Sequence, residues 1–496
     1  MSLGEASSPP AQNATSTKVK SVTRRVPLVR VLVLALLAVF LAGCAQTPPS
    51  TPPGIFTLLP TSGLVAFTGA GVATAVPSGI GSPTWAINDV KHSGAEPTMG
   101  VDAKGTLYVV SANDVFRSKD NGTTWQMVSP PANFPKTLDP LLWVDQDTGR
   151  VFLDHLYLAC SYLAFSDDQG ASWLYNPAAC GIPADDHQTL TTGKPVGVPL
   201  MPPVYPNVVY YGWNGIAYSG VARSLDGGMT FAGGVIAIDQ AHCGGLNGHM
   251  KTDKDGIVYL PAAGCDEPVV AVSRDSGLTW EQHTIATGGA GRSTPGDDPS
   301  IALDTAGNAY LIWPGKDAKM YGSVSTDKGK TWGTAFHISP PGITSSLEPV
   351  SIAGDAGRVA FGYYATTADT STWKTPNSDD APKDARWHLY VTYSLDAIGG
   401  PSATFVTQQL TPDDNPISIG RVHNGGSDGT PDRNLLDFFD MVRDGQGRVY
   451  VAYTDGCYHK CASDPATRLS QTTVATLTSG PGLLSAAPML GAPARS

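Results

Sequence analysis

Acidic residues open several similar segments of the chain and could do chemistry together. Four of the six stand directly before a proline. The six are Glu96, Asp139, Asp186, Asp298, Glu348 and Asp437. If their carboxylates converge, they could bind a structural cation or supply the acid and base of glycosidic cleavage. Asp298 and Glu348 are then the catalytic candidates, because crowded carboxylates raise one another's pKa. The alternative is that each carboxylate only caps a turn or accepts bonds from nearby backbone amides.

Cationic and aromatic residues on long connecting segments are candidates for binding a ligand. They are Arg292, Arg386, Arg421, Arg433 and Trp373. A guanidinium matches a carboxylate bidentately, so these arginines suit an anionic or glycan ligand. His187 and His249 lie near the acidic positions and could ligate a metal with Asp186 or Asp298. Single histidines in loops are more often surface residues, so we expect no metal site and no cofactor.

An eight-residue segment recurs along the chain and must position these side chains. It reads SKDNGTTW from Ser118, SDDQGASW from Ser166, SLDGGMTF from Ser224, SRDSGLTW from Ser273 and STDKGKTW from Ser325, and a degenerate copy starts at Ser394. Aspartate can accept bonds from turn amides, glycine can take a positive φ, and the aromatic ring can start a returning strand. The steps between the serines are 48, 58, 49, 52 and 69 residues, which suits four short strands per unit.

This segment resembles the Asp-box, or BNR, repeat. The resemblance implies a β-propeller and covers a family that includes sialidases, other glycosidases, receptors and non-enzymatic assembly factors. We therefore expect an all-β fold, a single propeller of four-stranded blades, with seven blades and six as the alternative. The segment from Pro83 to Asn88 resembles the closing strand of a box and is expected to complete the last blade. Asp-box turns then lie on one face, and the acidic residues and long loops on the other.

The resemblance to sialidases is incomplete. Sialidases of this superfamily hold the substrate carboxylate with three arginines, which Arg292, Arg421 and Arg433 could imitate. The Arg-Ile-Pro motif of the first arginine is missing, and no Tyr–Glu nucleophile pair is evident. We expect Tyr363 and Tyr364 to pack in the core. The Asp-box aspartates are explained by structure alone and are not catalytic candidates.

Composition limits the remaining function classes. The 496 residues carry a net charge of -11, which argues against nucleic-acid binding. Gly 55 and Pro 40 exclude coiled coils, while 41% hydrophobic content is enough for a large core. We expect a monomer.

The N-terminus is typical of an exported lipoprotein. Residues 31–43 form an apolar run behind three arginines, and the run ends in Leu-Ala-Gly-Cys at Cys44. This resembles a lipobox and implies diacylation of Cys44, which would anchor the chain in the cell membrane on its extracellular or periplasmic side. We divide the chain into a signal peptide (1–43), a Pro/Thr-rich tether (44–54), the propeller (55–480) and a flexible tail (481–496).

Six further cysteines predict disulfide bonds. Placing the strands of each blade assigns all three pairs to loops on the face opposite the Asp boxes: Cys160–Cys180, Cys243–Cys265 and Cys457–Cys461. Rigid loops suit a binding surface. The leading hypothesis is an anchored propeller that binds a glycan or a protein. The alternatives are an exo-sialidase-like glycoside hydrolase and a scaffold for envelope assembly.

Overall fold

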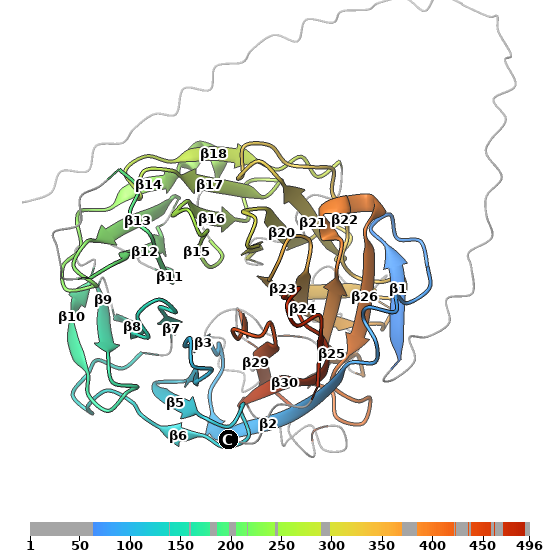
Figure 1. Ribbon diagram of the computed structural model, residues 1–496, viewed down its shortest axis with the longest axis horizontal. Helices are drawn as coiled ribbons and strands as arrows, with labels where there is room; N and C mark the ends of the chain where they lie inside the picture. The colour runs from blue at the N-terminus through green and yellow to red at the C-terminus, as the bar shows by residue number, and fades with distance from the viewer. Residues whose placement is uncertain are drawn as a thin grey trace, which may run out of the picture. The chain divides into compact units, whose positions relative to one another are not determined.

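The chain folds into a nearly all-β propeller. The computed structural model describes residues 63–491 except 138, 158–159, 179–185, 198–204, 216, 244–246, 289–297, 370–383, 421, 423–434, 436–437, 458–460 and 462–469. Within this range the strands form seven sheets arranged around a central axis (Figure 1). The expected seven-bladed propeller is confirmed, and six blades are excluded. No helix in the described part is long and apolar enough to cross a membrane.

The first four blades each hold four antiparallel strands, ordered from the inner to the outer edge. Blade 1 contains β3 (Met99–Val101), β4 (Leu107–Ser111), β5 (Asp114–Ser118) and β6 (Gln126–Met127). Blade 2 contains β7 (Pro140–Val144), β8 (Val151–Tyr157), β9 (Cys160–Ser166) and β10 (Leu174–Ala178). Blade 3 contains β11 (Asp186–Gly193), β12 (Val208–Asn214), β13 (Ser219–Ser224) and β14 (Val235–Ile238), followed by the 3-10 helix η1 (Gln240–His242). Blade 4 contains β15 (Lys251–Thr252), β16 (Val258–Ala262), β17 (Val269–Ser273) and β18 (Glu281–Thr284).

The last three blades include strands from both ends of the described chain. Blade 5 contains β19 (Ser300–Leu303), β20 (Ala309–Pro314), β21 (Met320–Ser325) and β22 (Phe336–His337). Blade 6 contains β23 (Ser345–Ala353), β24 (Val359–Thr366), β25 (Arg386–Ser394), β26 (Thr404–Gln409) and β1 (Leu64–Thr68), with η2 (Ala397–Ser402) between β25 and β26 and β27 (Ser418–Ile419) beside β25. Blade 7 contains β28 (Asp440–Arg443), β29 (Val449–Asp455), β30 (Gln471–Pro481) and β2 (Thr84–Ser93), and β31 (Met489–Leu490) pairs with β30.

The ring is closed by pairing between the two ends of the folded chain. β2 lies antiparallel to β30, with Ala86 opposite Thr476 and Asn88 opposite Val474 (Figure 1). This confirms that the segment around Trp85 completes the last blade. β1 adds a fifth strand to blade 6, which the sequence did not predict. Closure of this kind covers strand edges that would otherwise be exposed for pairing.

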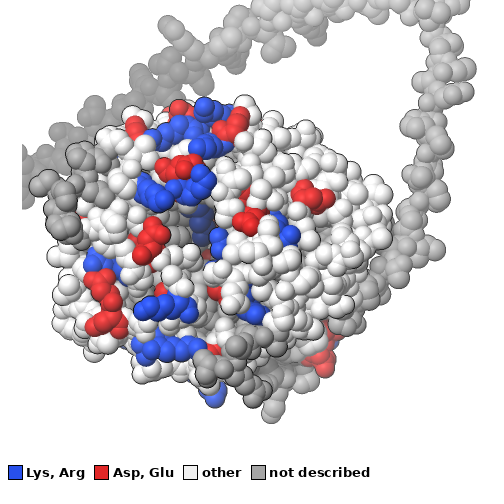
Figure 2. All heavy atoms as spheres, in the orientation of Figure 1, with Lys and Arg blue, Asp and Glu red and all other residues white. Residues whose placement is uncertain are grey.

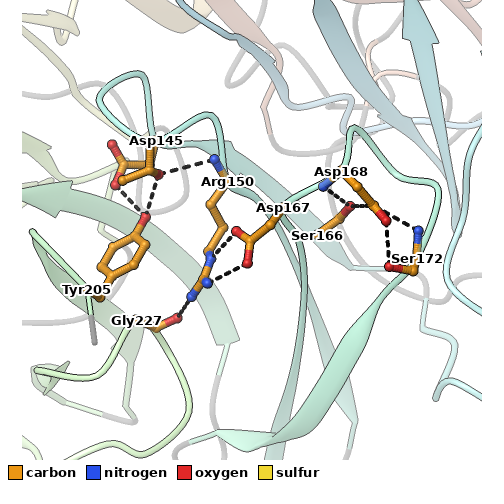
Figure 3. A network of polar contacts seen from close by, with 9 residues as sticks. Asp145, Arg150, Ser166, Asp167, Asp168, Ser172, Tyr205 and Gly227 are labelled. Carbon is orange, nitrogen blue, oxygen red and sulfur yellow. Dashed lines mark hydrogen bonds and ion pairs between the residues drawn. The ribbon is translucent and has the colours of Figure 1, made fainter. Parts of the chain in front are cut away.

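The Asp-box turns join the two outer strands of their blades, on what we call the lower face. In blade 2 the hydroxyl of Ser166 donates to Asp168 at 2.8 Å and accepts from the amide of Gly170 at 2.8 Å. The amide and hydroxyl of Ser172 donate to the two oxygens of Asp168, at 2.8 and 2.6 Å (Figure 3). These bonds, led by that of the Ser172 hydroxyl, lower the pKa of Asp168 to about 2. The carboxylate is therefore fully used in shaping the turn.

Each Asp-box turn is also bonded to the preceding blade. The guanidinium of Arg150 binds Asp167 with two bonds of 2.7 Å and donates to the carbonyl oxygen of Gly227, in the blade 3 box, at 2.7 Å (Figure 3). Equivalent bonds of 2.8 Å run from Arg117 to Gln169, from Arg223 to Ser276 and from Arg274 to Lys328. The acceptor is each time the box residue with positive φ. Neighbouring blades are thus joined by a repeated charge-assisted bond.

A second repeat forms the turns between the first and second strands. The sequences DAKGTLY, DKDGIVY, DTAGNAY and DGQGRVY begin at Asp102, Asp253, Asp304 and Asp444. In blade 5 Asp304 accepts bonds from the amides of Ala306 and Asn308, both at 2.9 Å, and from the hydroxyl of Tyr310 at 2.7 Å. These aspartates therefore fix the lower ends of the inner strands.

The folded part extends past the boundary expected at residue 480. β31 pairs with β30 through Gly480 and Leu490, and the side chain of Leu483 is fully buried in the core of blades 6 and 7. The carbonyl oxygen of Gly482 accepts bonds from Arg358. The prediction of a flexible tail from residue 481 is wrong as far as residue 491, because this segment supplies apolar contacts and a strand.

Candidate functional site

The upper end of the central channel is formed by residues that lie just before the inner strands or within their first few positions. These positions can be counted back from the turns between the first and second strands. The first residue of each turn donates its backbone amide to a carbonyl oxygen four or five residues later. The six donors are Asp102, Asp145, Asp253, Asp304, Gly354 and Asp444. Counting back six residues gives Glu96, Asp139, Asn247, Asp298, Glu348 and Phe438. In blade 3 the corresponding residue is His187. It stands two residues before Thr189, whose hydroxyl accepts a bond from the amide of Met250 in the next blade. In the same way Thr98, two residues after Glu96, accepts a bond from the amide of Leu142. We call these seven residues the upper ring.

The upper ring includes four of the six predicted carboxylates. They are Glu96, Asp139, Asp298 and Glu348. Asp186 and Asp437 each lie one position earlier in the chain, where the side chain of Asp186 and the whole of residue 437 are outside the described residues. The predicted set of ring residues did not include His187, Asn247 and Phe438. Counting back six residues from the first residue of each turn between the first and second strands could have identified such positions.

The ring carboxylates are enclosed. Glu96, Asp298 and Glu348 are 4%, 8% and 3% exposed, and Asp139 is half-buried beside Gln188, which donates to its backbone carbonyl oxygen. A cavity of about 20 Å³ lies beside Asp298, lined also by His249, Pro349 and Phe438. That volume holds roughly one water molecule. Among the described residues, the upper mouth is therefore filled by its own side chains.

One polar pair spans the ring. Nδ1 of His187 lies 2.8 Å from Oδ2 of Asp298, although the two residues belong to blades 3 and 5. Between them, Asn247 of blade 4 donates from its side-chain amide to the backbone oxygen of His187 at 3.1 Å. The ring of Phe438 packs edge-on against His187 and His249, with centroids 6.2 and 4.9 Å apart. Four blades meet in this cluster.

Three residues of the upper ring have a strained backbone. Glu96, His187 and Glu348 have φ values of 52°, 44° and 51°. A non-glycine residue in this region costs of order 1–3 kcal/mol and persists only where its surroundings require it. In blades 3 and 6 the strand pairing shifts register at these residues. The strained residues turn the chain into the inner strand and hold their side chains at the channel mouth.

Burial shifts the pKa values of two ionisable groups next to the ring toward their neutral forms. Burial lowers the pKa of His249 to about 3, and it raises the pKa of Asp440. Asp440 accepts bonds from the amides of Met99 at 3.0 Å and Met441 at 2.8 Å, so it joins blade 7 to blade 1. These two bonds give Asp440 a structural role.

Glu348 and Tyr364 are near enough to interact, but their surroundings do not suit a nucleophile. Burial, with a smaller contribution from Glu348, raises the pKa of Tyr364 well above its usual value. The hydroxyl accepts a bond from the amide of Thr454 at 3.1 Å, and the ring stacks on Phe439 at 4.4 Å. Tyr363 and Tyr364 are both fully buried in core clusters. An activated tyrosine needs a lowered pKa and access to substrate.

Of the predicted ligand-binding residues on the long loops, the structure describes Arg386. It is exposed at the start of β25 and donates to the carbonyl oxygen of Asp413 at 2.7 Å. Arg292, Arg421, Arg433 and Trp373 lie outside the described residues, and so does Cys44. Convergence of three arginines stays a prediction. The described residues include no group of three or more His, Cys, Asp or Glu that could hold a metal.

Two disulfides close loops on the upper face. Cys243 is bonded to Cys265, which joins the approach to β15 to the β16–β17 loop. Cys457 is bonded to Cys461 within the β29–β30 connection. Both predicted pairs are confirmed, on the predicted face. The third pair cannot be followed because Cys180 lies outside the described residues.

Comparison with known proteins adds only distant structural likeness. No protein-family model matches the chain, and a search of curated proteins finds no match. The chain is similar to a protein of unknown function from Dyadobacter fermentans, with 13% identity, a TM-score of 0.40 and coverage of 79% of this chain and 99% of the other. It is also similar to the GH74 xyloglucanase from Xanthomonas campestris, with 14% identity, a TM-score of 0.44 and coverage of 78% of this chain and 55% of the other. A third similar structure is a mutant NanB sialidase from Streptococcus pneumoniae, with 12% identity, a TM-score of 0.34 and coverage of 87% of this chain and 71% of the other. Scores this low carry no information about substrate or mechanism.

Proposed function

We propose that this protein is a lipid-anchored component of the cell envelope whose propeller binds an extracellular ligand, a glycan or a protein, through its upper face. The observation that carries the proposal is the filled upper mouth. The His187–Asp298 pair and Phe438 pack together at the upper mouth and leave a cavity of about 20 Å³ beside Asp298, so recognition falls to the surrounding rim. Two disulfides close loops of that rim, and rigid loops on a rigid scaffold suit binding.

The same geometry favours binding over hydrolysis. A glycosidase needs two carboxyl groups that reach the scissile bond from open space. Asp298 and Glu348 are less than a tenth exposed, and the cavity beside Asp298 has about 20 Å³. Pockets for small ligands usually have about 300 Å³ or more. The enclosed carboxylates therefore support a structural role for Asp298 and Glu348.

Binding is tested with the purified full-length protein in detergent on a glycan array and in pull-downs from an extracellular protein mixture. The two informative variants are Arg386→Gln and replacement of residues 370–383, in the β24–β25 connection, by a short Gly/Ser linker. We expect each to weaken binding at least tenfold. Asp168→Asn, in an Asp box on the lower face, is the matched control and should bind as the wild type does. Equal loss in all three variants, or no bound ligand at all, would contradict the proposal.

Hydrolysis is tested separately with fluorogenic sialosides and a panel of other glycosides. We expect no turnover above buffer. Turnover that Glu348→Gln and Asp298→Asn both abolish, in variants that remain folded by circular dichroism, would replace the binding proposal with a glycoside hydrolase.

The anchor has its own test. Cells expressing the wild type should incorporate radiolabelled palmitate into the protein and retain it in the membrane fraction. Cys44→Ala should lose both the label and the membrane retention. Equal labelling of the variant would show that Cys44 is not the lipidated residue.

A further inference from the structure

We propose that the lower half of the central channel is a binding site for a small multivalent oxyanion. The site lies at the opposite end of the channel from the upper ring and does not depend on the proposed function. A cavity of about 390 Å³ opens between the lower ends of the inner strands of the blades. Its size suits a small organic ligand rather than a single water or ion.

Four cationic residues line this cavity, and one of them, Lys254, is paired with an aspartate. The other three come from three blades. They are Lys194 of blade 3, Lys251 of blade 4 and Arg443 of blade 7. Lys194 is exposed, and Lys251 and Arg443 are partly buried. Within the described part of the chain, no carboxylate oxygen lies within 4.0 Å of a charged nitrogen of these three residues. Lys and Arg side chains are visible in and around the hollow at the centre of the face seen in Figure 2.

The cations have few other partners. Nζ of Lys251 lies 5.4 Å from the centre of the Trp143 ring, which is a cation–π contact. Arg443 donates to the backbone oxygens of Ala353 at 2.8 Å and Asp444 at 3.4 Å, and burial lowers its pKa. Asp355 and Asp444 also interact electrostatically with Arg443, and Asp440 with Lys251, although none of them lies within 4.0 Å as an ion pair. An anion in direct contact would stabilise these partly buried cations further, because the local dielectric is low.

The acidic residues that also line the cavity are already bonded elsewhere. The carboxylate of Asp145 accepts a bond from Tyr205 (Figure 3). It also accepts from Asn207, and that of Asp304 accepts from Asn308 and Tyr310. Both are 2% exposed.

Three further charged residues complete the lining. Asp253 is 6% exposed and accepts from amides of its own turn. Asp147 is exposed and accepts from Asn207, and Lys254 is paired with Asp255 at 2.9 Å. The four aspartates of the lining keep their charge, but their carboxylates already accept bonds from protein donors, so the ionic groups left to bond a ligand directly are Lys194, Lys251 and Arg443.

The arrangement suits an anion with several oxygens. Three cations on three sides can each contact a different oxygen of a phosphate, pyrophosphate or tricarboxylate group. The hydroxyls of Thr192, Thr252 and Ser351, from blades 3, 4 and 6, also line the cavity and offer further hydrogen bonds. A bound anion would join blades 3, 4 and 7 across the axis and so stabilise the ring.

The experiment is isothermal titration of the full-length protein in detergent with sodium pyrophosphate and, in a second arm, with sodium citrate. Sodium chloride at matched ionic strength corrects for general screening. We expect one site per chain, and the tighter of the two probes identifies phosphate or carboxylate as the preferred group. Lys251→Gln and Lys194→Gln should each weaken binding at least tenfold. Lys330→Gln, an exposed lysine of the blade 5 Asp box that does not line the cavity, is the charge-matched control and should leave affinity unchanged.

Two outcomes would overturn the proposal. One is the absence of saturable binding of both probes at millimolar concentration. The other is equal affinity of the wild type and both channel variants. Because Lys251→Gln could disturb folding, its melting temperature without anion is measured first. The exposed Lys194→Gln variant keeps the test decisive if Lys251→Gln does not fold.

Discussion

His187 and Asp298 form a hydrogen-bonded pair with 2.8 Å between Nδ1 and Oδ2, although they stand at the start of the inner strands of two non-adjacent blades. Both side chains are less than a tenth exposed. Their contact passes above blade 4, whose Asn247 bonds to the backbone of His187. A polar pair of this kind, taken out of water, holds the geometry of the channel mouth more firmly than an exposed pair could.

The first prediction is a strong coupling between these two residues. A double-mutant cycle of His187→Gln and Asp298→Asn should give a coupling free energy of about 1–3 kcal/mol in urea unfolding at pH 7, because each single change leaves a buried polar partner behind. The matched control is the exposed pair His242–Asp239, whose atoms are 2.7 Å apart. Its cycle should give less than about 1 kcal/mol. Equal coupling in the two cycles would contradict the structural role that we assign to the upper ring.

The second prediction concerns the disulfides. Cys243–Cys265 closes a separation of 22 residues and Cys457–Cys461 one of 4. Loop-closure entropy then predicts losses of about 3 and about 2 kcal/mol when each pair is changed to alanine. Urea unfolding of the two double variants measures both values. A larger loss for the shorter loop would show that packing of the buried Cys457 and Cys461 outweighs chain entropy.

The propeller could be predicted because its signal is local and repeated. Ser166, Asp168 and Gly170 bond to one another within five residues, so the sequence alone specifies the turn. Closure of the ring was also predictable, since Trp85 stands in a segment like the closing strand of a box. The second turn repeat, from Asp304 to Tyr310, is present in the sequence but lacks the serine two positions before the aspartate that marks an Asp box.

The site was less predictable because its contacts join distant parts of the chain. His187 and Asp298 are 111 residues apart, and only register within the sheets brings them together. Burial of Glu348 also depends on the packing of several blades rather than on its neighbours in sequence. The bonds from arginine to the next Asp box were missed for the same reason: the acceptor is a backbone carbonyl, which leaves no trace in residue type.

The third prediction tests one of those inter-blade bonds. Arg223→Met keeps the apolar stem but removes the donor to the carbonyl oxygen of Ser276, 2.8 Å away. We expect a loss of about 1–3 kcal/mol in the free energy of unfolding, the usual range for a bond to a charged donor. Lys330→Met, at an exposed position, removes the same charge and should change stability by less than about 0.5 kcal/mol. Similar losses in both variants would mean that the positive charge, and not the bond to Ser276, accounts for the change in the free energy of unfolding.

The fourth prediction is a pH dependence that originates at Asp455. Burial raises the pKa of this carboxyl from 3.8 to about 7, with a smaller contribution from Asp89 and an opposing bond from the amide of Cys457. The folded state therefore holds the proton more tightly than the unfolded state. The stabilisation is fully present below pH 3.8 and is lost as the pH rises to about 7. One pKa unit is about 1.36 kcal/mol, so the loss is at most about 4 kcal/mol.

Asp455→Asn should remove this dependence, because an amide can still accept the bond from Cys457 and does not ionise. Unfolding free energies at pH 4 and pH 7.5 should differ less in the variant than in the wild type, and the variant should be the more stable protein at pH 7.5. Asp255→Asn is the opposite control. Bonds from Lys328 and Lys254 lower the pKa of Asp255 to about 2, so its contribution is present above pH 3.8 and is lost only in acid. If Asp455→Asn leaves the slope between pH 4 and 7.5 unchanged, the carboxyl is ionised in the folded protein and our interpretation of its burial is wrong.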